Sequence, residues 1–228
     1  MWEKIKNFWK SDNLLDEAWD NSFEMIKISQ EMFLEAVKVL RKTHDTTLDE
    51  KIKKQDKIVN KYERDVRKKV MTHLSLQAPK GLPEGMVLIS IVIDIERLGD
   101  YTKNIVELAS RRKDILEGGK LESDLKKIEE AVKDNFNKTV ECIETSNQTN
   151  AIELLNKYRW VNPLCDDSLT KLVLEEDKNI AAGQSAALAL YFRWLKRINS
   201  HLRNITTSVV NPFHRIGFKV KKKDEVLA

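Results

Sequence analysis

Residues 95–106 read IERLGDYTKNIV, and residues 195–206 read LKRINSHLRNIT. The two segments share Arg, Asn and Ile at the same places, and Leu98 is matched by Ile198. Further upstream, Val59-Asn60 has the counterpart Val161-Asn162 at nearly the same spacing. Two matches in the same order along the chain predict that the protein is built from a tandem repeat.

The apolar residues around this repeat recur at helical spacing, which predicts long helices. Six such segments cover about 14–40, 48–74, 83–112, 121–143, a stretch beginning near 150, and 179–210. The pairs Thr47 with Glu50 and Asn150 with Glu153 have the spacing of helix caps. Pro163 predicts a kink in the fifth segment, because proline removes a helical amide donor.

Gly118-Gly119 divides these segments into three and three. The sequence therefore predicts an all-α fold of two tandem three-helix bundles. The first would occupy residues 1–117, including an N-terminal extension. The second would occupy residues 118–228 and end in a basic tail.

The composition agrees with helices and excludes several other classes. Only 7 of the 228 residues are Gly and 4 are Pro, which is too few for the many turns of a sandwich, barrel or propeller. A net charge of +4 gives no reason to expect a nucleic-acid partner. The longest apolar run, 86–93, is too short to span a membrane, and the first residues lack a signal-peptide pattern. With two cysteines, Cys142 and Cys165, we expect a reducing, cytoplasmic location.

Oxygen-bearing side chains form a stripe in the first copy of the repeat. Glu96, Asp100, Asn104 and Glu107 fall within about 80° on a helical wheel. A second group, formed by Asp56, Asn60 and Glu63, is clustered as tightly on the preceding helix. If these two helices are antiparallel neighbours, both groups can face one another.

A bound cation would offset the repulsion between such carboxylates. Carboxylate and amide oxygens are hard ligands that suit Mg, Ca, Mn or Fe. The alternative is a solvated acidic face, which is common in a chain of which 33% is charged. A carboxylate-metal enzyme of the hydrolase type and a metal-free structural protein are the corresponding alternatives for function.

The second copy has lost the acidic residues. Glu96, Asp100 and Glu107 correspond to Lys196, Ser200 and Thr207. Asp56 and Glu63 correspond to Tyr158 and Cys165. The second copy therefore cannot bind a hard cation in the way predicted for the first.

The segment DIERLGD at 94–100, followed by Asn104-Ile105 and Glu107, resembles the signature of the PhoU family of phosphate-transport regulators. The family's acidic motif falls on Glu96 and Asp100, and its upstream element falls on Asp56, Asn60 and Glu63. The likeness extends over nearly the whole chain. It departs in the second copy, where the acids are replaced.

This resemblance implies a non-catalytic cytoplasmic regulator that restrains phosphate uptake and represses starvation signalling. Its implied partners are a phosphate transporter and its sensor kinase at the inner face of the membrane, and a second copy of the chain is a further possible partner. The implied cofactor is iron, zinc, manganese or magnesium. Its ligands would be Glu96, Asp100, Asp56, Asn60, Glu63, Asn104 and Glu107.

The two chain ends are basic. Trp2, Ile5 and Trp9 lie on one side of a predicted amphipathic helix, which could contact a membrane surface or pack over the first bundle. The tail carries Arg215, Lys219 and 221–223, which we interpret as solvated. Arg97, repeated as Arg197, is interpreted as a structural partner of neighbouring groups.

Overall fold

The computed structural model describes residues 14–220 except 44, 46–47 and 78. These residues form helices and no strand, which confirms the all-α prediction. The long helices are α2 (Leu14–Lys38, extended by a π-helical turn Val39–Thr43), α3 (Leu48–Gln77), α4 (Leu82–Ser110), α5 (Glu122–Thr145), α6 (Gln148–Lys157), α7 (Val161–Val173) and α8 (Ala182–Thr207). Short 3₁₀ turns occupy Gly119–Leu121 and Phe213–Arg215.

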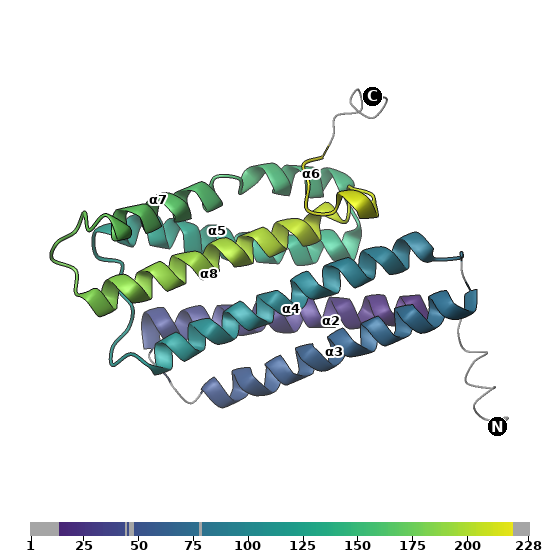
Figure 1. Ribbon diagram of the computed structural model, residues 1–228, viewed down its shortest axis with the longest axis horizontal. Coiled ribbons are helices and arrows are strands. Elements are labelled where there is room, and N and C mark those ends of the chain that lie inside the picture. The colour runs from purple at the N-terminus through teal and green to yellow at the C-terminus, as the bar shows by residue number, and fades with distance from the viewer. Residues whose placement is uncertain (1–13, 44, 46–47, 78, 221–228) are drawn as a thin grey trace.

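The helices pack in two sets. In the first set α2, α3 and α4 contact one another, and in the second α5 and α8 pack with α6 and α7, which follow each other in line (Figure 1). The sets meet where α4 runs along α8 and α2 contacts α5. Phe33 of α2 stacks on Phe136 of α5 with ring centroids 5.7 Å apart, within one continuous apolar core. The proposed domain boundary between residues 117 and 118 stays a prediction.

Pro163 lies in the first turn of α7, where no helical donor is needed. The chain leaves helical geometry just before it, at 158–160, so the expected kink is a break between two helices.

The predicted cap at Asn150 was wrong. Asn147 caps α6 instead, and its side-chain oxygen accepts a hydrogen bond from the Asn150 amide at 3.1 Å. The reason is that Ser146, with φ 51°, already ends α5, so the next helix begins at once. The predicted cap at Thr47 lies outside the described residues.

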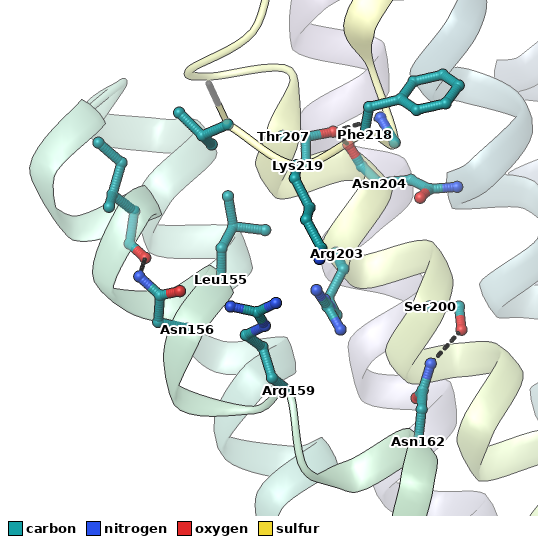
Figure 2. A pocket seen from close by; sticks show the side chains of 13 residues that line it. Leu155, Asn156, Arg159, Asn162, Ser200, Arg203, Asn204, Thr207, Phe218 and Lys219 are labelled. Carbon is teal, nitrogen blue, oxygen red and sulfur yellow. Dashed lines mark hydrogen bonds between the residues drawn. The ribbon is translucent and has the colours of Figure 1, made fainter. Parts of the chain in front are cut away.

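After α8 the chain turns back over its own helix (Figure 2). The backbone N–H of Gly217, a residue with φ 85°, donates to Thr207 Oγ1 at 2.7 Å. The Asn211 side-chain amide donates to the carbonyl oxygens of Arg215 and Phe218, both at 2.9 Å. These bonds fix segment 217–220 beside α6 and α8.

A buried ionic network joins the two sets of helices. Arg41, just after α2, has a side chain that is only 8% exposed. Its Nε lies 2.9 Å from Glu129 Oε1 and its Nη2 lies 2.6 Å from Glu122 Oε1, both on α5. Its Nη1 donates to the Leu116 carbonyl. Tyr191 of α8 donates its hydroxyl to Glu129 Oε1 at 2.8 Å. One carboxylate therefore connects three helices.

We expect Arg41→Met to destabilise the fold by about 3–5 kcal/mol, because it leaves Glu129 buried without its counter-charge. The double variant Arg41→Met/Glu129→Leu should recover most of this loss, since no uncompensated charge remains. Urea unfolding followed by circular dichroism measures both. Equal destabilisation by the single and double variants would contradict a mainly electrostatic role.

Candidate functional site

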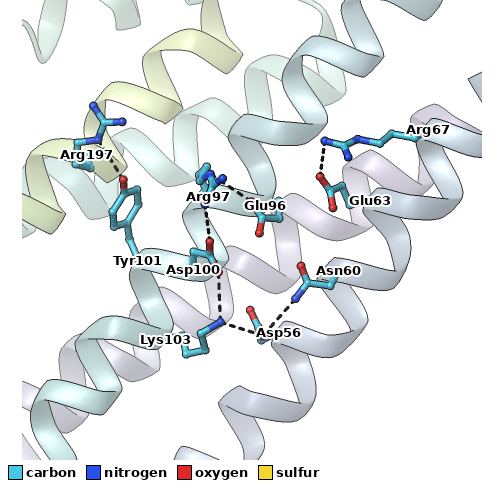
Figure 3. A network of polar contacts seen from close by, with 10 residues as sticks. All are labelled: Asp56, Asn60, Glu63, Arg67, Glu96, Arg97, Asp100, Tyr101, Lys103 and Arg197. Carbon is cyan, nitrogen blue, oxygen red and sulfur yellow. Dashed lines mark hydrogen bonds and ion pairs between the residues drawn. The ribbon is translucent and has the colours of Figure 1, made fainter.

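The acidic groups predicted on α3 and α4 lie opposite one another across the helix pair (Figure 3). Asp56, Asn60 and Glu63 line one side of α3, and Glu96 and Asp100 lie on the facing side of α4. The helices are joined by a tight turn in which Gly81 has φ 74°. Because this turn makes the helices antiparallel neighbours, the two oxygen-rich stripes meet as the spacing predicted.

Cations of the chain itself are placed among these carboxylates. Lys103 Nζ lies 3.3 Å from Asp56 Oδ2 and 3.3 Å from Asp100 Oδ1, and so bridges α3 and α4. Burial lowers the pKa of Lys103, but the charges of Asp56 and Asp100 outweigh this effect and raise it overall. The ammonium group therefore stays charged between the two acids.

Two arginines complete the network. Arg97 Nη1 lies 2.9 Å from Asp100 Oδ2, and its Nε lies 3.6 Å from Glu96 Oε2. Arg67 Nη2 lies 2.8 Å from Glu63 Oε1. The interpretation of Arg97 as a structural partner thus agrees with its contacts, although its side chain is 51% exposed.

The network in Figure 3 includes neither Asn104 nor Glu107. Asn104 lies one turn beyond Asp100 and is half-buried. Glu107 instead faces Arg111, with 3.6 Å between Oε2 and Nη2. Five of the seven predicted ligands are therefore brought together, and two are not part of the group.

In this arrangement the residues do not fit a metal ion. Within the described ranges, no three acidic, histidine or cysteine side chains are grouped so that they could hold one. The position between Asp56 and Asp100 is taken by the Lys103 ammonium. The metal site is therefore not shown and stays a prediction. Sequence reasoning missed Lys103, although its spacing of three from Asp100 places it on the same helix face.

Glu96 carries the strongest electrostatic signature of the group. Burial is the main cause that raises its pKa, from 4.5 to about 7, and the charges of Asp100 and Glu63 add to it while Arg97 opposes them. The native state therefore binds a proton at Glu96 more readily than the unfolded chain does. Stability falls as the pH rises from about 4.5 to about 7 through this group.

We expect Glu96→Gln to remove this pH dependence. At pH 8 the variant should be more stable than the parent by about 1–2 kcal/mol, and the difference should vanish near pH 4.5. Chemical unfolding across this pH range provides the measurement. A constant difference at every pH would show that Glu96 ionises as a solvated glutamate does.

The second set of helices replaces the charges by neutral amides. Asn135 donates to Asn199 Oδ1 at 2.8 Å, Asn199 donates to Asn162 Oδ1 at 2.9 Å, and Asn162 donates to Ser200 Oγ at 2.9 Å. Asn135 and Asn199 are buried and were not identified from the sequence. Their amides link α5, α7 and α8 without any ion.

Three other positions of the second copy that correspond to acids of the first also have defined surroundings. Lys196 Nζ pairs with Asp166 at 2.6 Å. Tyr158 donates its hydroxyl to Asp134. Cys165 is buried, and burial raises the pKa of its thiol to about 12, so it stays protonated. In the second copy, Lys196 and Tyr158 thus contact acids of that copy, and Cys165 is a neutral buried side chain.

Asp94, at the start of the motif, contacts α8. Its Oδ1 lies 2.6 Å from His201 Nδ1 and accepts a hydrogen bond from Asn204 Nδ2 at 3.1 Å. Tyr101 stacks on the His201 ring at 5.7 Å and accepts a hydrogen bond from Arg197 Nε at 3.2 Å. Residues of the matching segments 94–106 and 195–206 therefore contact one another where α4 lies beside α8.

Residues 23–109, which span most of α2 and all of the motif on α3 and α4, match the model of the PhoU domain. The chain carries a PhoU domain. The resemblance noted from the DIERLGD segment is therefore confirmed, and all seven predicted ligands lie inside the matched region.

Proteins that are similar to most of the chain are also named PhoU. The chain is 24% identical over 208 residues to a phosphate-specific transport system accessory protein PhoU homolog of Clostridium acetobutylicum, covering 86% of this chain and 90% of that protein. The crystal structure of PhoU from Pseudomonas aeruginosa is similar with a TM-score of 0.78 and 21% identity, over 87% of this chain and 96% of that one. The phosphate transport system regulatory protein PhoU from Streptococcus pneumoniae gives 0.75 and 16%, over 88% and 95%. These structures show that the likeness in fold extends beyond residue 109.

Proposed function

We propose that the protein is a non-catalytic regulator of phosphate transport and phosphate-starvation signalling. The observation that carries this proposal is the PhoU domain at 23–109, together with similarity over most of the chain to an accessory protein of a phosphate-specific transport system. The protein would act through contacts with a phosphate transporter and its sensor kinase. None of the described helices is long and apolar enough to cross a membrane. We place its action in the cytoplasm, at the inner face of the membrane.

A deletion strain tests this regulation directly. We expect loss of the gene to raise phosphate uptake in phosphate-rich medium and to switch on a starvation reporter, since the restraint on both is removed. Radiolabelled phosphate uptake and reporter fluorescence are the measurements. Re-expression of the intact chain should reverse both effects. Unchanged uptake and an unchanged reporter would count against the proposal.

We also propose that a divalent or trivalent metal ion (Fe, Zn, Mn or Mg) enters the acidic group only in exchange for Lys103. The support is electrostatic: Asp56 and Asp100 already share one positive charge, so a metal must displace the ammonium group before it gains both carboxylates. Among the residues drawn in Figure 3, removing Lys103 would leave four acids beside two arginines.

We expect Lys103→Met to bind Mn²⁺ at least about tenfold more tightly than the parent, which corresponds to about 1.4 kcal/mol. Lys68→Met, on an exposed face of the same PhoU domain, is the matched control and should leave the affinity unchanged. Calorimetric titration and elemental analysis of the purified proteins measure this. Tight, stoichiometric metal in the parent, or no gain in Lys103→Met, would refute the exchange.

A further inference from the structure

A second polar site lies in the other half of the chain. A pocket of about 650 Å³ opens between α6, the start of α7 and α8, and segment 217–220 forms its remaining wall. This wall is fixed by the bonds from Gly217 to Thr207 and from Asn211 to Phe218. At Gly217 an added Cβ would lie 3.2 Å from Asn204 Oδ1, so the segment approaches α8 closely.

Three cations from three different segments point into this pocket. Arg159 comes from the break between α6 and α7, Arg203 from α8 and Lys219 from the C-terminal wall, and Figure 2 shows their charged ends turned toward one another. The pocket lining contains no Asp or Glu. In the part of the chain that the structure describes, none of the three forms an ion pair with a carboxylate.

The positive charges gathered in this pocket repel one another. The pKa of Arg203 is lowered, first by burial and then by the positive charge of Arg159. Like charges that are gathered without a counter-ion raise the free energy of the empty pocket. An anion that binds between them would remove this repulsion.

The repeat explains how this charge arose. Arg203 corresponds to Lys103 of the first copy, whose ammonium is held by Asp56 and Asp100. In the second copy the positions of these two acids are occupied by Tyr158 and Ser200. Tyr158 donates its hydroxyl to Asp134, and Ser200 accepts a hydrogen bond from Asn162. The cation has been kept while both of its acidic partners have been lost.

Guanidinium groups favour ligands with several oxygens that share a negative charge, because their N–H donors form a planar fork. Two arginines and a lysine fit a doubly charged tetrahedral group better than a single carboxylate. The Asn156 side-chain amide in the same lining donates one hydrogen to the Ile152 carbonyl oxygen and has a second N–H for a remaining oxygen of such a ligand.

We propose that this pocket binds a phosphoryl group through Arg203, Arg159 and Lys219. The group can belong to orthophosphate, to a soluble phosphate ester or to a lipid headgroup, which share this chemistry. The proposal depends on the pocket alone and would hold whether or not the protein regulates phosphate transport.

The test uses the purified full-length chain at about 0.1 M ionic strength, where distant surface charges are largely screened. Isothermal titration with inorganic phosphate and with ATP examines the two soluble sources. Co-sedimentation with phosphatidylcholine vesicles, with and without phosphatidic acid, examines the lipid. We expect saturable binding of one equivalent in at least one arm, and the arm that binds identifies the source.

Arg203→Met should weaken this binding at least about tenfold. Arg193→Met removes an exposed arginine ten positions earlier on α8 and should bind as the parent does. Because Arg203 pairs with no carboxylate of the described residues, its replacement should leave the thermal midpoint at or above that of the parent, so lost binding cannot be attributed to unfolding. No saturable binding in any arm, or equal weakening by both variants, would overturn the proposal.

Discussion

The contact on which the whole arrangement depends is the charge pair between Arg41 and Glu129. Both side chains are only 8% exposed, so each buried charge needs the other as its counter-charge. Burial and the negative charge of Glu129 both raise the pKa of Tyr191, which keeps its hydroxyl protonated as the third member. Because these residues come from three separate segments, their geometry fixes how the two sets of helices meet. The same orientation brings α4 beside α8.

The two repeat copies balance charge in different ways. The PhoU domain places acids and cations in a network across α3 and α4, so that each acid of the network lies beside a cation. The second copy uses buried amides between its helices and leaves cations at the edge of a pocket. Duplicated helices thus share their packing, whereas the polar residues at equivalent positions have separated into two kinds of site.

The sequence predicted the helices well because their apolar stripes are long and regular. It also predicted that Asp56 and Glu96 would approach one another, since a short turn forces neighbouring helices together. It did not predict the role of Lys103, because that role requires the partner helix to be in place. The sequence also did not predict the hydrogen bonds of Asn135 and Asn199 or the pocket around Arg203, for a related reason. Their partners are distant in the chain, and no local pattern announces such contacts.

The sequence predicts that Gly118 and Gly119 connect two bundles. In the structure, the residues around this link also join the two sets of helices by non-covalent contacts. The Gly118 amide donates to Glu122 Oε2 at 2.5 Å, and Glu122 in turn pairs with Arg41. The aromatic stack of Phe33 on Phe136 holds the halves together independently of the peptide link. The covalent join therefore serves mainly to keep the partners at high effective concentration. If the chain were cut between these glycines, the two fragments would still carry the Arg41–Glu129 pair and the Phe33–Phe136 stack through which they can associate.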